Sequence, residues 1–343
     1  MNLTNTRRYL LRAAAALALA GALSACDAVY DDLDPCTVTY RVRFTYDYNM
    51  KFADAFPAEV HSVQVWAFDA DGRPAWHGEA YGDALTDPDF AMTVDLKPGT
   101  YTFLTWGGLR DSPFLLDTME PQAVTDLGVS LPLKSPSRTE SLYADYELRG
   151  LYHGCVEDVV LKNYENVNAT QDVVIPLVKD TNLVSVMLQH INGTPIAQGD
   201  FSISISAANS ELGWDNAVLA GPRFSYEPWA YTYGLAEAPG SDATSVNSLL
   251  AEMSTSRLMA DGKEMLSVVR NTDNTEIIRI PLIDYLLLVK GNYHRDLTDQ
   301  EYLDRQDEYS MIFFLTEDNS WYTAGGIYIN SWAVVPPQTG EEI

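Results

Sequence analysis

The sequence predicts an all-β protein made of two β-sandwich domains in tandem, with a few short helices. Apolar and polar residues alternate over short stretches, as in Val38–Tyr46, and this period of two is typical of half-buried strands. Turn-forming residues such as Asp69–Gly72 separate these stretches. The 343 residues are enough for two domains, and the pattern breaks near Val178. We therefore expect one domain over residues 37–178 and a second over residues 179–343.

In the first domain, strands are predicted at residues 37–46, 61–68, 92–96, 101–106, 122–133, 141–148 and 171–178. Residues Asp69–Gly72 are predicted to form a hairpin turn. This turn is similar to the start of a calcium-binding loop, but Gly78 stands where that loop requires a bidentate glutamate, so no metal site is predicted. Arg41 and Arg43 lie on the polar side of the first strand, where we expect them to pair with acidic side chains; a trypsin-like cleavage site is the alternative.

In the second domain, strands are predicted at residues 183–188, 201–207, 277–280, 310–316 and 326–335. Residues 245–259 are ambiguous: Val246, Leu249, Leu250 and Met253 fit one face of a helix, whereas residues 254–259 fit a strand better. A short helix is predicted over residues 281–289, because it opens on a proline, which suits the first helical turn. Thr298 and Glu301 form a capping-box pattern for another helix over residues 299–307.

The composition excludes several classes of protein. Hydrophobic residues make up 46% of the chain and aromatic residues 11%, which is enough apolar surface to exclude disorder for most of it. The 22 Lys and Arg residues against 48 Asp and Glu residues give a net charge of −26 at pH 7. Such a charge repels a phosphate backbone, so nucleic acid is not an expected partner.

Residues 1–25 have the pattern of a secretory signal peptide, with three arginines and no acidic residue before an apolar run too short to span a bilayer. Leu23-Ser24-Ala25-Cys26 is similar to the lipobox of bacterial lipoproteins, in which the cysteine becomes the lipidated first residue. The alternative is ordinary signal cleavage beside an incidental cysteine. Residues 26–36 are then an acidic, lipidated tether, which either signals export to the cell surface or is a plain linker. Removing the signal leaves 19 basic residues (22 minus 3) against 48 acidic ones, a net charge of −29.

The other two cysteines are either bonded to each other or free. With Cys26 lipidated, Cys36 and Cys155 remain in an oxidising compartment. They are expected either to form a disulfide or to stay as two separate thiols. A bond would close a loop of about 120 residues, which the chain-entropy model values at about 5 kcal/mol.

The sequence contains none of the common catalytic motifs. G-x-S-x-G, the P-loop, G-x-G-x-x-G and H-E-x-x-H are all absent. The five histidines lie far apart, with no spacing suited to a metal ion. The seven tryptophans and twenty tyrosines mostly alternate within predicted strands, where core packing explains them better than a sugar-binding surface does. We therefore expect no enzymatic activity, no cofactor and no small-molecule substrate.

Blocks of residues along the whole mature chain resemble the FimB/Mfa2 family of fimbrial anchor subunits from Bacteroidetes. One block departs from the family pattern, because Ser331 stands where a glycine is expected. The blocks are Phe44–Met50, Ala53–Phe56, Val63–Gly72, Gly99–Phe103, Trp106–Gly108, Tyr152–Gly154, Gln300–Gln306, Tyr309–Leu315 and Ile327–Trp332.

The resemblance implies two transthyretin-like β-sandwiches, a lipoprotein held in the outer membrane through its N-terminal lipid and facing the cell surface, and fimbrillin-type shaft subunits as partners. It also implies assembly by donor-strand exchange, in which an added strand completes an open sheet edge. We expect this subunit to keep the strand Val38–Tyr46, since losing it would detach the lipid, and to donate Ile327–Val335. The alternative is that this last segment is a core strand. Its alternate residues are Ile327, Ile329, Ser331, Ala333 and Val335.

Two other functions compete with an anchor. A glycan-binding surface lipoprotein of the same architecture is the closer alternative, and an exposed Tyr/Trp surface would distinguish it. A secreted hydrolase is the other, and it would need a cleft with converging carboxylates.

Overall fold

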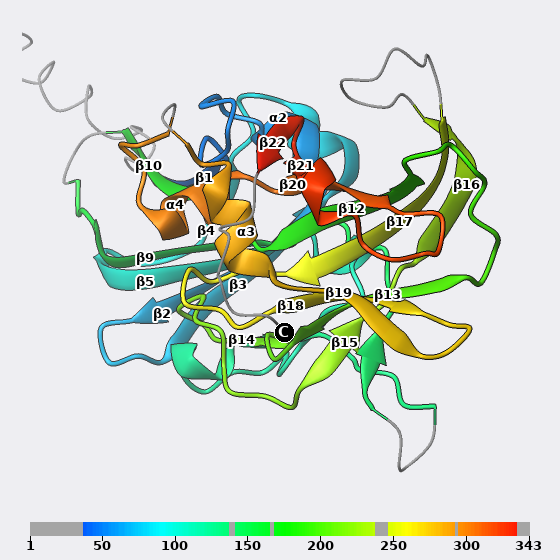
Figure 1. The fold of residues 1–343 in the computed structure, drawn as a ribbon. Helices are drawn as coiled ribbons and strands as arrows, with labels where there is room; N and C mark the ends of the chain where they lie inside the picture. Colours follow the sequence, from blue (N-terminus) through cyan, green and yellow to red (C-terminus); the bar gives the residue numbers. More distant parts are fainter. Residues whose placement is uncertain (1–36, 137–140, 165–167, 237–245, 292–293, 335–343) are drawn as a thin grey trace, which may run out of the picture. The chain divides into compact units, whose positions relative to one another are not determined.

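The structure, a computed structural model, describes residues 37–136, 141–164, 168–236, 246–291 and 294–334. It is all-β with a few short helices, as predicted (Figure 1). The chain divides into two compact units, Met1–Thr39 with Asn163–Thr170 and Tyr40–Lys162 with Gln171–Ile343. In the first unit, the Thr37 N–H donates to Asn168 Oδ1 (2.9 Å), and the Ala169 N–H donates to the Thr37 carbonyl (3.2 Å).

Two sheets are built from the first half of the chain. The three-stranded sheet has the order β10 (Ala169–Pro176), β1 (Val38–Thr45), β4 (Met92–Val94). The five-stranded sheet has the order β11 (Val178–Lys179), β9 (Tyr152–Leu161), β5 (Gly99–Gly107), β2 (Ser62–Asp69), β3 (Pro74–Tyr81). The period of two in β1 is explained by its burial, since Tyr40, Val42 and Phe44 are buried while their neighbours are half-buried.

Two further sheets, of six and five strands, are built mainly from the second half. The six-stranded sheet has the order β16 (Ala230–Ala236), β17 (Val246–Ser256), β12 (Thr181–His190), β20 (Glu308–Leu315), β21 (Ile327–Ile329), β22 (Trp332–Val334). The other has the order β19 (Thr275–Pro281), β18 (Met265–Arg270), β13 (Phe201–Ala207), β15 (Phe224–Tyr226), β8 (Tyr143–Ala144). β12 and β20 run parallel, and β12 pairs antiparallel with β17 along its length. The ambiguous segment at residues 245–259 is therefore a strand from Val246 to Ser256, and the helical alternative is wrong.

Residues 115–144 pair with strands of the second half. β6 (Leu115–Leu116) and β7 (Val129–Ser130) form a small sheet with β14 (Glu211–Leu212), and β8 pairs parallel with β15. The long strands predicted at 122–133 and 141–148 are wrong, because only these two-residue strands form there. Each predicted segment lies near residues that interrupt a ladder, including Pro121, Pro132 and Pro136. β11 belongs to the five-stranded sheet of the first half, and the next strand, β12, belongs to the six-stranded sheet of the second half. The domain boundary at 178 stays a prediction.

The helices are short. They are α2 (Phe56–Glu59), α3 (Leu282–Leu288) and α4 (Asp299–Arg305), with 3₁₀ turns η1 (Gly82–Thr86), η2 (Leu109–Asp111), η3 (Val124–Asp126) and η4 (Thr323–Gly325). The predicted N-cap of α4 is confirmed, because Thr298 Oγ1 accepts a hydrogen bond from the Glu301 N–H at 3.0 Å.

One hydrophobic cluster includes side chains from both halves of the chain. Trp66 and Trp106 of the first half belong to the same cluster as Val186, Ile203 and Phe313 of the second. All five are almost fully buried, so these tryptophans have the core role that the alternation predicted. Figure 1 shows β2, β5 and β9 on one side of the drawing and β12, β16 and β17 on the other.

Candidate anchoring and assembly site

The first strand after the predicted tether is a central strand of its sheet. β1 lies between β10 and β4, and Val42 has no solvent exposure. The Phe44 ring stacks on Phe56 at 5.3 Å between centroids, and the Tyr40 hydroxyl donates to the Lys162 carbonyl at 2.7 Å. Burying each such side chain contributes about 1.5–3 kcal/mol. Core packing and hydrogen bonds to two neighbouring strands therefore hold β1 in place against a force applied at the N-terminus.

The two arginines of β1 pair with acidic side chains, as expected. Arg41 makes a two-point contact with Asp172 of β10, with Nε and Nη2 at 2.7 and 2.9 Å from the two carboxylate oxygens. Arg43 Nη2 lies 3.4 Å from Asp89 Oδ1. The hydrogen bond from Arg41 holds the pKa of Asp172 below its ordinary value. These contacts support the strand-partner interpretation over a cleavage site.

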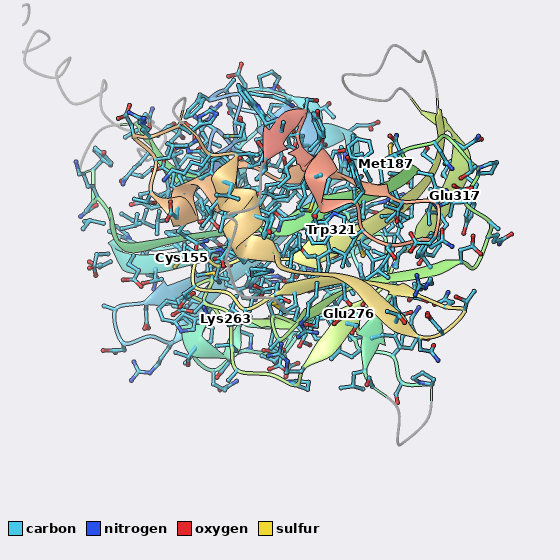
Figure 2. The ribbon with its side chains drawn as sticks, in the orientation of Figure 1. Cys155, Met187, Lys263, Glu276, Glu317 and Trp321 are labelled. Atoms are coloured by element: carbon cyan, nitrogen blue, oxygen red, sulfur yellow. The ribbon has the colours of Figure 1, made fainter. Side chains whose placement is uncertain are left out.

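The predicted lipid and disulfide sites lie largely outside the described residues. Cys26 and Cys36 both precede residue 37, so the lipidation of Cys26 and the Cys36–Cys155 bond stay predictions. Cys155 is half-buried on β9 and is labelled in Figure 2. Burial raises the pKa of its thiol to about 11, which makes it a weak nucleophile at neutral pH.

The C-terminal segment is a hairpin and not the single strand that was predicted. β21 pairs antiparallel with β20, and β22 folds back on β21 after a two-residue turn. Ile327 and Ile329 are fully buried in the core cluster, whereas Ser331 lies in the turn and Ala333 is exposed. Val335 lies outside the described residues. The five residues therefore do not share one face, and β21 has the packing of a core strand.

The turn itself explains why the sequence pattern was misleading. Asn330 and Ser331 have φ values of 47° and 69°, which is the left-handed geometry of a type I′ hairpin turn. Asn330 tolerates this conformation because its side chain is fixed: Oδ1 accepts from the Ser310 N–H (2.8 Å) and Nδ2 donates to the Glu308 carbonyl (3.2 Å). Asn-Gly is the usual sequence for such a turn, and here serine occupies the glycine position.

A buried polar cluster links the segment at the predicted domain boundary to the second half. Arg257 forms two hydrogen bonds with the carboxylate of Asp304, at 2.9 and 2.8 Å, and its Nε lies 3.8 Å from Asp180 Oδ1. Asn216 Nδ2 donates to the same Asp180 oxygen at 2.8 Å. Asp180 has no solvent exposure, and burial raises its pKa to about 7 despite the nearby guanidinium.

Further contacts join the two halves around this cluster. The Arg305 guanidinium lies over the rings of Tyr48 and Phe52, at 4.0 and 4.8 Å from their centroids, and donates to the Asp47 carbonyl at 3.1 Å. His153 Nε2 donates to the Trp214 carbonyl at 2.8 Å, and burial lowers the pKa of this histidine to about 4, so the ring is neutral.

Sequence reasoning found none of these contacts, because the partners lie far apart in the chain. With 48 acidic and 22 basic residues, no ion pair stands out from the sequence alone. The one local signal is the polar run Asp180-Thr181-Asn182, which by itself indicates only a break between strands.

Within the described ranges, no group of three or more His, Cys, Asp or Glu side chains is arranged to hold a metal ion. No helix of the described chain is long and apolar enough to cross a membrane.

The sequence and the fold match those of known proteins. The model of the family "Fimbrillin-A associated anchor proteins Mfa1 and Mfa2" matches residues 33–335, which is most of the chain. The chain therefore belongs to this family of fimbrial anchor proteins. It is 25% identical over 288 residues to the minor fimbrium anchoring subunit Mfa2 of Porphyromonas gingivalis, covering 82% of each chain.

Several solved structures have folds similar to that of this chain. A candidate adhesin from Bacteroides thetaiotaomicron is 36% identical with a TM-score of 0.75, covering 89% of this chain and 99% of that one. A candidate polysaccharide-binding protein from the same organism is 30% identical with a TM-score of 0.73, covering 89% and 100%. The fimbrial anchor protein Mfa2 of P. gingivalis shares the fold, with 19% identity, a TM-score of 0.64 and coverage of 88% and 99%.

Proposed function

We propose that this protein is a lipid-anchored fimbrial anchor, which attaches a fimbria to the outer membrane through Cys26 and joins shaft subunits by strand addition. β1 carries this proposal. The Leu23–Cys26 motif precedes β1 by a short acidic segment, so tension from a fimbria would pass through β1 to the lipid. Because β1 is a central, core-packed strand, it resists being drawn out of the fold.

The polar cluster supports the same role. A load-bearing subunit has to carry tension between its first strand and its distant parts without opening. Arg257 joins Asp180 and Asp304, which lie far apart within the second half, and Arg305 of α4 connects that half to the first-half segment at Asp47. Removing one partner from such a buried set leaves an uncompensated charge, which costs about 3–5 kcal/mol.

Co-purification tests the proposal. The tagged chain is extracted with detergent from outer membranes, and its partners are identified by mass spectrometry. Fimbrial shaft subunits are expected to accompany the wild-type chain, which also incorporates labelled palmitate, whereas Cys26→Ala incorporates no label. Recovery of the chain from the soluble fraction without fimbrial subunits would overturn the proposal.

A glycan site is the second candidate, and one cavity favours it. The cavity, of about 610 Å³, is lined by Trp229 together with Glu59, Glu252, Arg149 and Lys179. Aromatic and charged side chains around a concave site suit the apolar faces and hydroxyl groups of a sugar. Retention of the wild-type chain on a glycan column, and its loss in Trp229→Ala, would support this function; equal behaviour of the two proteins would exclude this cavity.

A further inference from the structure

The edges of the sheets differ in how well they are protected against pairing with another chain. An edge strand presents unpaired backbone N–H and C=O groups, and proteins usually protect it by charge, proline or short length. Three long edge strands, β3, β10 and β19, carry such residues, and Figure 2 labels one of them, Glu276. The protecting residues are Pro74 and Glu79 in β3, Asp172 and Pro176 in β10, and Glu276, Arg279 and Pro281 in β19. The edge strands β4, β6, β8, β11, β14 and β22 have only two or three residues each.

β16 is the exception among the described edges. Its seven residues, Ala-Tyr-Thr-Tyr-Gly-Leu-Ala, include no charge and no proline, in a chain whose net charge is −26. It pairs with β17 from Ala230 opposite Glu252 to Ala236 opposite Val246. No described strand pairs with its other side. A long, uncharged edge of this kind is the best template in the described structure for an added strand.

Two tyrosine side chains of β16 lie on the core-facing side of the sheet but remain partly exposed to solvent. Tyr231 and Tyr233 lie opposite Ala251 and Leu249, which are fully buried, so both tyrosines are on the core-facing side of the sheet. They are nevertheless 41% and 36% exposed, because no strand follows β16 on that side in the described chain. The Tyr231 ring extends toward the backbone of Ile203 on β13 of the other sheet, and partial burial raises the pKa of its hydroxyl. One more strand would continue this face and cover both rings.

We propose that β16 is the docking edge for an extended, uncharged strand of a fimbrial shaft subunit, whose alternate apolar side chains cover Tyr231 and Tyr233. This rests on the proposed function, which supplies the partner. The packing of β21 supports this direction of docking, because its isoleucines are buried in the chain's own core and are not free to leave it. Charge disfavours a second copy of this chain, because two acidic molecules repel each other, while an uncharged strand adds no repulsion.

Site-specific photo-crosslinking tests the docking edge. A photoreactive phenylalanine analogue replaces Tyr233, and the same analogue replaces Tyr322 as a control, since that side chain has a matching exposure of 37% on a different segment. The complexes are purified from cells and the linked peptides are sequenced. We expect position 233 to link to one uncharged, alternating segment of a shaft subunit and position 322 not to link to it. A link from position 233 only to a second copy, or no link, would overturn the proposal.

Lysine substitutions give an independent measurement. Tyr233→Lys places a charge where the added strand would bury it, so we expect at least a tenfold loss of shaft subunits recovered per chain, and no loss in Tyr322→Lys. Tyr231→Lys, which places the charge on the same face of β16 at a side chain that is 41% exposed, provides a second variant if Tyr233→Lys melts at a lower temperature than the wild type. Unchanged recovery in both β16 variants would refute the docking edge and leave the anchor function intact, whereas absence of shaft subunits even with the wild type would refute the anchor function itself.

Discussion

Replacing Ile329 by alanine is expected to lower the free energy of unfolding by about 2–5 kcal/mol. Ile329 lies on β21, between Met311 of β20 and Trp332 of β22, and it has no solvent exposure. Removing its side-chain methyl and methylene groups forfeits their transfer free energy and leaves a cavity in the core cluster. The range reflects how far the hairpin relaxes into that cavity, since β22 is a three-residue edge strand.

Urea unfolding, followed by tryptophan fluorescence, measures the effect. The midpoint should fall while the slope of free energy against urea stays constant, because the same surface is exposed on unfolding. Ile191→Ala is the matched control: that isoleucine is 54% exposed, and its loss should change stability by less than about 0.5 kcal/mol. If Ile329→Ala changes stability as little as the control does, β21 is not a core strand, and that result would favour the donor role predicted for this segment.

Three further predictions use the same unfolding assay. Ser331→Gly should stabilise the protein by about 0.5–1 kcal/mol, because glycine adopts φ of 69° without strain; a loss of stability would argue against the type I′ turn. Arg257→Ala should lower the free energy of unfolding by about 3–5 kcal/mol, because it leaves the carboxyl groups of Asp304 and Asp180 without their cation. The exposed Arg279→Ala should change it little, and equal effects of the two substitutions would contradict the buried cluster. Asp180, with a folded pKa raised to about 7, keeps a proton that the unfolded chain releases near pH 4, so its stabilising contribution is full below about pH 4 and is lost as pH rises toward 7. Asp180→Asn should remove that part of the pH dependence, and identical pH profiles for the two proteins would refute it.

The parts of the fold that the sequence predicted are those determined by local patterns. The alternation of Phe201–Ala207 corresponds to β13, whose apolar side chains are buried. The capping box predicted α4, because Thr298 satisfies a backbone N–H within its own turn. In both cases the decisive interaction, or the face that is buried, can be inferred from neighbouring residues.

The sequence was misleading where a local pattern continued through a turn. From Ile327 to Val335, every second residue except Ser331 is apolar, so the pattern predicts one strand through Asn330 and Ser331. The reversal depends on hydrogen bonds between Asn330 and the distant strand β20, and no local rule reveals them. The same limit applies to Arg257, whose carboxylate partners lie 77 and 47 positions away in the chain.

The short strands between residues 115 and 144 show a third limit. Their partners, β14 and β15, belong to the second half of the chain. Because pairing to a distant strand supplies the stability that local alternation lacks, the extent of β7 and β8 depends on tertiary contacts. The boundaries of such strands cannot be predicted from their own residues.

The retention of fimbriae on cells tests the anchoring role most directly. Cells expressing wild-type chain or Cys26→Ala are separated from their medium, and the fimbrial shaft protein in each fraction is measured. A lipid anchor at Cys26 predicts that wild-type cells keep their fimbriae, while Cys26→Ala cells release them into the medium together with the unlipidated chain. Fimbriae that stay on Cys26→Ala cells in wild-type amounts would contradict the proposal that this chain holds them to the membrane.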